Sequence, residues 1–168
     1  VVSHTEPGRN GKAALEVPTG IYVFNRSVLE LIPEKGFCDI VLDDMVDYSS
    51  DYERNTPVVS TTLTNSQNAA VKITDFAPRF RNYERIFRPP QLMRIIEPVA
   101  GLPRITIRMR PTHRYGKPIR RYTIGSNHIR YAEEETVVRL STDAPLALIE
   151  AESPFALTRP VTVIFGQD

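Results

Sequence analysis

The sequence predicts a mainly β protein, an antiparallel β-sandwich with a short strand-helix segment in front of it. Three observations support this fold class: short runs alternate apolar and polar residues, they recur about every ten residues without helical patterns between them, and prolines lie between them or at their ends. Successive side chains leave opposite faces of a strand, so such runs cover a core on one side and meet solvent on the other.

The clearest predicted element is a hairpin over residues 57–77. Its two strands are "PVVSTTLT" and "AAVKITDFA", and "NSQN" supplies turn residues between them. Five further runs continue the predicted series, namely "LMRIIEPV", "RITIRMRP", "NHIRYA", "TVVRLST" and "VTVIFG". We therefore expect a sandwich domain, partial in its strand content, over residues 39–168.

The run "RITIRMRP" shows the expected two-sided character most plainly. Ile105, Ile107 and Met109 fall on one face of the strand. The opposite face carries Arg104, Arg108 and Arg110. We interpret the first set as core residues and the second as a solvated or interdomain face.

Residues 1–38 form the first predicted unit, with a different character. The polar residues 1–17 read as a loose arm, whereas "TGIYVF" reads as a strand followed by Asn25, a helix N-cap residue type. Val28, Leu29 and Ile32 share one helical face, and Pro33 ends the pattern. We expect a strand and a short helix over residues 19–32.

Composition is typical of a soluble globular domain. The chain has 168 residues, of which 41% are hydrophobic and 24% charged, and no apolar run approaches the roughly 20 residues of a spanning helix. The N-terminus lacks the order of a signal peptide, so we expect a cytoplasmic protein with no membrane partner. The single Cys38 is expected to be a small buried group, and the scattered His4, His113 and His128 predict no metal site. No cofactor is expected.

Charges are distributed unevenly along the chain. Acidic residues dominate between Glu30 and Glu53, and basic residues dominate between Arg79 and Arg121. The two regions could attract each other across the fold, or the basic one could face an anionic partner. The arginines and aromatics of residues 79–88 resemble an RNA-binding arm, but they match no RNA-binding module and the isoelectric point is only about 8.1. We expect a sheet face there and no nucleic-acid partner.

Candidate site residues are few. Asp75 is either a catalytic acid or, as we favour, a structural residue in a strand-end turn. Ser126 lacks a nucleophile-elbow context, and the acidic run Glu133–Glu135 matches no catalytic motif, so no catalytic residue is predicted. A carbohydrate site is one alternative, in which exposed rings near the "GSNH" turn stack on a sugar; its candidate residues are Tyr115, Asn127, His128 and Tyr131, with Tyr122 nearby.

Several segments, taken in order, resemble a known family over about residues 39–166. They are "DMVDYSSDYERNTPVVSTTL", "AVKITDFAPRF", "RIFRPPQLMRIIEPVAGLPRITIRMRP", "RYGKP", "GSNHIRY" and "VVRLSTDAPLALI". Together they look like the N-terminal β-sandwich domain of bacterial glycoside hydrolase family 15, the glucoamylase and trehalase-like group. The resemblance implies a sandwich that packs against a downstream catalytic (α/α)6 barrel, which carries two catalytic glutamates. The sequence stops at Asp168, before any such barrel could begin, and the opening strands of the family's sandwich have no counterpart here.

A second, shorter resemblance covers about residues 17–40. The segment "VPTGIYVFNRSVLELIPEKGFCDI" is similar to a late strand-helix segment of sugar-nucleotide pyrophosphorylases. The glycine-rich nucleotide loop and metal-binding aspartates of that family have no counterpart in the chain. The two resemblances together suggest a fusion of fragments with a junction between Pro33 and Asp43.

The sequence therefore predicts a non-catalytic module of a glycoside hydrolase family 15-like protein, without enzyme activity in this chain alone. Its expected role is packing against a catalytic barrel or oligomer assembly. A carbohydrate-binding module and a fragment of a sugar-nucleotide nucleotidyltransferase remain alternatives. An incomplete sandwich leaves strand edges and an apolar face uncovered, so we expect a homo-oligomer in which neighbouring copies or the N-terminal segment replace the missing strands.

Overall fold

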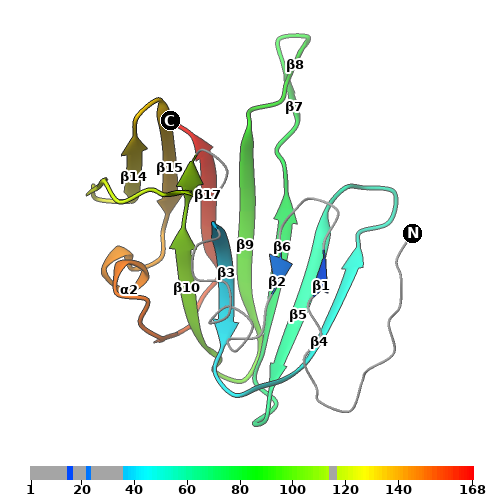
Figure 1. Ribbon diagram of the computed structural model, residues 1–168. Coiled ribbons are helices and arrows are strands. Elements are labelled where there is room, and N and C mark those ends of the chain that lie inside the picture. Colours follow the sequence, from blue (N-terminus) through cyan, green and yellow to red (C-terminus); the bar gives the residue numbers. More distant parts are fainter. Residues whose placement is uncertain (1–14, 17–21, 24–35, 114–116) are drawn as a thin grey trace.

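The computed structural model describes residues 15–16, 22–23, 36–113 and 117–168, and it shows two antiparallel sheets packed face to face (Figure 1). The prediction of a mainly β fold built from antiparallel sheets is confirmed. The predicted strand at residues 19–24 contains β2 (Tyr22–Val23), which pairs with β1 (Leu15–Glu16). The predicted helix at residues 26–32 lies outside the described residues.

The larger sheet has eight strands, and every neighbouring pair in it is antiparallel. In spatial order the strands are β13 (Tyr122–Ile124), β14 (His128–Glu133), β15 (Thr136–Thr142), β17 (Val161–Gln167), β9 (Gln91–Ala100), β6 (Ala70–Phe76), β5 (Val59–Asn65) and β4 (Met45–Tyr52).

The smaller sheet has three strands, in the order β16 (Phe155–Ala156), β10 (Arg104–Arg110) and β3 (Phe37–Leu42). Like the β1–β2 pair, two further strand pairs form separate two-stranded sheets, β7 (Phe80–Asn82) with β8 (Arg85–Phe87) and β11 (Thr112–His113) with β12 (Lys117–Pro118). The helix α2 (Leu146–Glu150) contacts β10.

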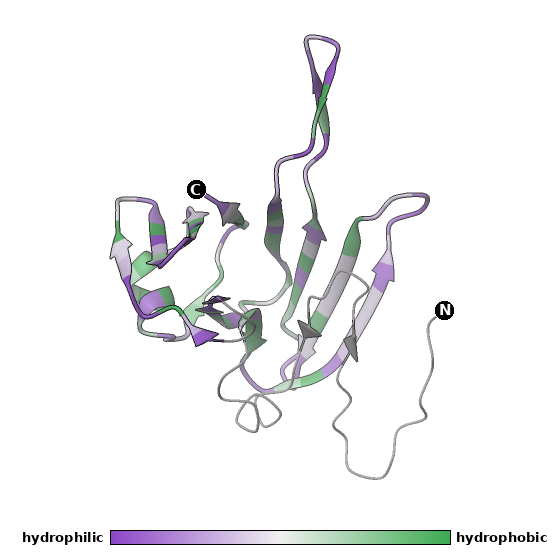
Figure 2. Ribbon diagram, turned by 45° about the horizontal axis from the view of Figure 1, so that its top comes forward, coloured by the Kyte–Doolittle hydropathy of each residue, from purple (hydrophilic) through white to green (hydrophobic). Residues whose placement is uncertain are grey.

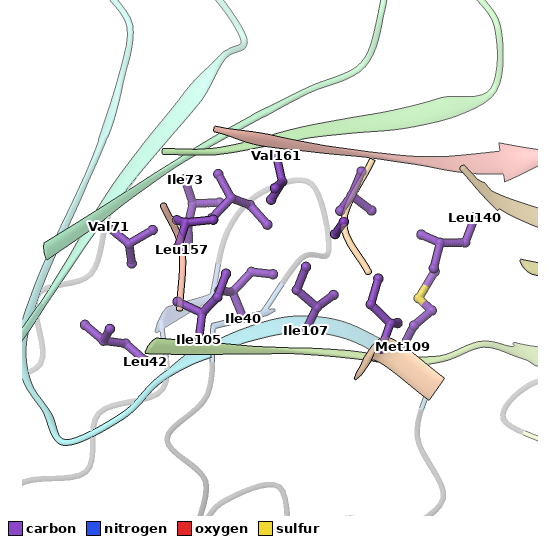
Figure 3. Close-up of a cluster of buried hydrophobic side chains, with 14 of the residues drawn as sticks. Ile40, Leu42, Val71, Ile73, Ile105, Ile107, Met109, Leu140, Leu157 and Val161 are labelled. Atoms are coloured by element: carbon purple, nitrogen blue, oxygen red, sulfur yellow. The ribbon is translucent and has the colours of Figure 1, made fainter. Parts of the chain in front are cut away.

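The hydrophobic core lies between the two sheets. Figure 3 shows Ile105 and Ile107 of the smaller sheet facing Ile73 and Val161 of the larger one, with Leu157 between them. The two isoleucines of β10 are fully buried, as the alternation of the sequence predicts. Burial of apolar surface on both inner faces is therefore what joins the sheets.

The acidic and basic regions of the sequence meet in the smaller sheet. Arg108 of β10 forms a bidentate ion pair with Asp39 of β3, with nitrogen–oxygen distances of 3.0 and 2.5 Å. A second contact of 3.5 Å joins Arg104 to Asp43, and both of these side chains are exposed. The expectation that the two charged regions attract each other across the fold is thus met on the outer face of this sheet.

The strand β3 lies across the boundary expected between residues 38 and 39. Phe37 and Cys38 pair with Arg110 and Met109 of β10, in the same ladder as Asp39 and Ile40. Cys38 also packs against the core cluster as a partly buried residue. The sandwich therefore includes residues from Phe37 onward, because a strand cannot leave its sheet within a continuous ladder of backbone hydrogen bonds.

The turn of the predicted hairpin is organised by one asparagine. The side-chain oxygen Oδ1 of Asn65 accepts hydrogen bonds from the backbone N–H groups of Gln67 and Ala69, at 3.0 and 2.9 Å. Asn68 closes the turn in the left-handed region, with a φ of 60°. Asn65 itself is 8% exposed, so water cannot easily replace these bonds.

We expect Asn65→Ala to lower the free energy of unfolding by about 1–2 kcal/mol, because two backbone donors lose their acceptor in a buried turn. Urea denaturation followed by circular dichroism measures this change. Asn68→Gly is the matched control, and it should be nearly neutral because glycine adopts a positive φ without strain. Equal losses in both variants would contradict this role for Asn65.

Candidate functional site

A hairpin of β7 and β8 projects beyond the end of the larger sheet, between β6 and β9 (Figure 1). Its strands pair Phe80 with Phe87, and the two rings stack with centroids 5.5 Å apart and planes inclined by 12°. Both rings are nonetheless about half exposed, at 50% and 43%. Figure 2 shows hydrophobic and hydrophilic residues side by side along this hairpin. Stacked rings in solvent are the anchors that protein interfaces favour.

The tip of the hairpin is strained. Tyr83 and Glu84 form the turn with φ values of 45° and 65°, and the Tyr83 side chain is 92% exposed. Two consecutive positive φ values are typical of a type I′ turn, which favours Asn-Gly. A bulky tyrosine is unfavourable at a positive φ, and the exposed Tyr83 side chain gains little packing within the chain to offset this cost.

The hairpin is strongly basic. Residues 79–88 contain one acid, Glu84, and four bases, namely Arg79, Arg81, Arg85 and Arg88. Within the described part of the chain, none of these four arginines has an ion-pair partner. The surface therefore combines exposed aromatic rings with uncompensated positive charge.

An open pocket of about 530 Å³ lies at the same end of the larger sheet. Its apolar walls come from Leu92 of β9, Val138 of β15 and Phe165 of β17, and Glu135 stands among the lining residues. Leu92 and Phe165 fall in the same alternation as the buried Ile96 and Val163, so they belong to the core-facing side of the sheet. None of the lining residues comes from the smaller sheet, so within the part of the chain that the structure describes this sheet does not cover that end of the apolar face.

Inside the sandwich, Arg94 of β9 is 2% exposed and forms a bidentate ion pair with Asp75 of β6. The two nitrogen–oxygen distances are 2.6 and 2.8 Å, and a third bond of 2.8 Å from Nη1 reaches the Cys38 carbonyl oxygen of the smaller sheet. Burial raises the pKa of the neighbouring Cys38 thiol, which keeps the sulfur neutral beside Arg94.

This ion pair corrects one prediction and supports another. Asp75 lies within a strand and bonds a side chain, whereas the sequence suggested a strand-end turn bonded to backbone amides. The guanidinium holds both carboxylate oxygens of Asp75, and the pair joins the two sheets through the Cys38 carbonyl oxygen, which fits the structural role that the sequence favours.

The predicted carbohydrate residues that the structure describes do not all share one face. His128 and Asn127 are adjacent, with 3.2 Å between Nδ1 and Oδ1. Tyr131 is only 7% exposed and belongs to the core cluster, and burial raises the pKa of its phenol. It points to the face of β14 opposite to His128, because the two residues are an odd number of positions apart. Tyr115 lies outside the described residues.

Nearby Tyr122 is exposed, but its hydroxyl donates a 3.0 Å hydrogen bond to Glu150 of α2. Its ring also packs against Tyr131 with centroids 6.0 Å apart. Among the described residues of this set, Tyr131 is therefore buried and Tyr122 is held by its neighbours. Asn127 is exposed and His128 is half-buried.

Sequence reasoning missed the hairpin as an element. The sequence predicts a sheet face over residues 79–88, whereas in the structure "FRN" and "RIF" flank a two-residue turn and pair only with each other. The sequence lacks a recognisable turn signal here, because neither Tyr83 nor Glu84 is a residue type that favours a positive φ. The pocket was also not predicted, since it depends on how far the smaller sheet extends.

Comparisons of this chain with protein-family models, with curated proteins and with solved structures found no match. Among the described residues, no helix has the length and apolar character needed to cross a membrane. The same residues hold no group of three or more side chains placed to bind a metal ion.

Proposed function

We propose that this chain is a non-catalytic β-sandwich module of a glycoside hydrolase family 15-like protein, of the glucoamylase or trehalase type. In this proposal the module packs against a catalytic (α/α)6 barrel or takes part in oligomer assembly. The ordered segments from about residue 39 to residue 166 support the family, and the two-sheet fold is compatible with it.

The observation that carries the role is the end of the sandwich with the β7–β8 hairpin. It presents the stacked Phe80 and Phe87 rings and four arginines without ion-pair partners in the described structure, beside an open apolar pocket. Such surfaces are typical of protein contacts, where aromatic residues and arginine dominate the binding energy. A contact role therefore explains features that a self-sufficient domain does not need.

The acidic residues give less support to catalysis. Glu133, Glu134 and Glu135 lie at the turn between β14 and β15, and Glu134 is within 3.9 Å of His113. Glycosidases instead place two carboxyl groups across the bond that they cleave. The buried Asp75 and Asp39 are both held by arginines.

The non-catalytic part of the proposal is tested by incubating the purified chain with trehalose and with maltooligosaccharides and measuring glucose release. We expect no release above the blank. Glu133→Gln/Glu134→Gln/Glu135→Gln is the control variant. Release at enzyme-like rates by the original chain that disappears in this variant would show a glycosidase and overturn the proposal.

The packing part is tested with a family 15 catalytic barrel expressed without its own sandwich. We expect the chain to co-elute with this barrel in size-exclusion chromatography and to raise its melting temperature. Phe80→Ser/Phe87→Ser should weaken both effects. Calorimetric titration with trehalose and maltose separates this role from the carbohydrate-binding alternative, for which heat of binding is expected.

A further inference from the structure

We infer that two copies of this chain associate through their hairpin ends, with the β7–β8 hairpin of each copy seated in the open pocket of the other. The partner at this surface is thus a second copy. This inference deepens the assembly part of the proposed function. Its test needs neither sugar nor barrel, so its failure leaves barrel packing standing.

The apolar parts of the two surfaces match. The hairpin offers the stacked Phe80 and Phe87 rings, which are about half exposed. The pocket offers Leu92, Val138 and Phe165 and has a volume of about 530 Å³, within the range that holds large side-chain groups. Burying the rings against these walls removes apolar surface from water on both sides.

The charges of the two surfaces are also complementary. The hairpin carries four arginines, and Arg81 and Arg85 lie in its two strands. The pocket includes Glu135, which belongs to the acidic turn that also contains Glu133. The hairpin is therefore basic and aromatic, whereas the pocket is apolar with the acidic Glu135 in its lining, so the hairpin is attracted to the pocket and repelled by a second hairpin.

The placement of the two surfaces allows a closed dimer. The hairpin leaves the sheet between β6 and β9, and the pocket is lined by β9, β15 and β17 at the same end (Figure 1). A two-fold axis beyond this end brings each hairpin to the partner's pocket, so both contacts form at once. The hairpin extends away from its own sheet, which leaves its rings free to reach another copy.

The test uses two charge-reversal variants in sedimentation velocity over a dilution series. One is Arg81→Glu/Arg85→Glu in the hairpin, and the other is Glu133→Arg/Glu135→Arg at the pocket. We expect the original chain to sediment as a dimer and each variant alone to dissociate at least about tenfold more readily, because each places like charges in both contacts.

Mixing the two variants in equal amounts is the decisive step. In the mixed dimer an acidic hairpin meets a basic pocket and a basic hairpin meets an acidic pocket, so both contacts are attractive. We expect the mixture to recover the dimer. Arg54→Glu/Arg120→Glu reverses two exposed arginines outside the hairpin and should leave the dimer unchanged.

Phe80→Ser/Phe87→Ser provides a second variant that changes no charge, and it should also give monomers, with a circular dichroism spectrum like that of the original chain. A monomeric original chain at all concentrations would overturn the inference. Dimers that persist in the hairpin and pocket variants, or a mixture that stays monomeric, would overturn it as well.

Discussion

Replacing Arg94 with leucine is expected to lower the free energy of unfolding by about 3–5 kcal/mol, the range found when one partner of a buried ion pair is removed. Arg94 is 2% exposed and Asp75 is 7% exposed, so the carboxylate would be left without its partner inside the sandwich. The Cys38 carbonyl oxygen would lose its donor from β9 in the same step. Chemical denaturation at neutral pH measures the loss.

Two further variants test whether the loss comes from leaving a buried charge without its partner. Asp75→Val/Arg94→Met removes both charges, and it should be much milder than the single change because apolar residues of similar size often replace a buried pair with little loss. Arg104→Leu breaks an exposed contact of 3.5 Å with Asp43, and it should cost less than about 1 kcal/mol. Similar losses from Arg94→Leu and Arg104→Leu would contradict the structure.

Replacing Ile107 with alanine is expected to lower the free energy of unfolding by about 2–5 kcal/mol. Ile107 is fully buried in β10 and faces the larger sheet across the core (Figure 3). The substitution removes apolar contact and leaves a cavity that the two sheets cannot close without moving relative to each other. Thermal and urea denaturation give the change in stability.

Leu102→Ala is the matched control for Ile107. Leu102 is 61% exposed in the turn between β9 and β10, so its truncation should change stability by less than about 0.5 kcal/mol. If Ile107→Ala were as mild as Leu102→Ala, β10 would not lie in the core. The face of β10 that carries Ile105 and Ile107 would then not be the buried one.

Alternation of side chains made most strands of this fold predictable. The hairpin at residues 57–77 and the strand with Ile105 and Ile107 follow the two-residue period closely, because one face of each is buried. The strands β3 and β4 were not predicted. In β4 the residues are polar or exposed along most of its length at the edge of the sheet, so no apolar period marks it.

The candidate site was less predictable than the fold. Arg94 looks like an ordinary polar residue in "LMRIIEPV", and its burial depends on Asp75, which is distant in sequence but opposite in the sheet. The hairpin residues Phe80 and Phe87 were noticed for their chemistry, yet their exposure depends on the hairpin leaving the sheet. The burial of Arg94 and the exposure of the two rings depend on how strands pair over long range, which the local alternation of residues does not predict.

Hydrogen-deuterium exchange of the chain at high and low concentration tests most directly the claim that the hairpin end is the surface through which this module associates. We expect slow exchange in β5, β6, β9, β10 and β17 at both concentrations, because these strands form the core of the sandwich. Residues 79–88 and 135–138 should be protected only at high concentration. Equal exchange of these two segments at both concentrations, together with new protection along β4 alone, would contradict the account.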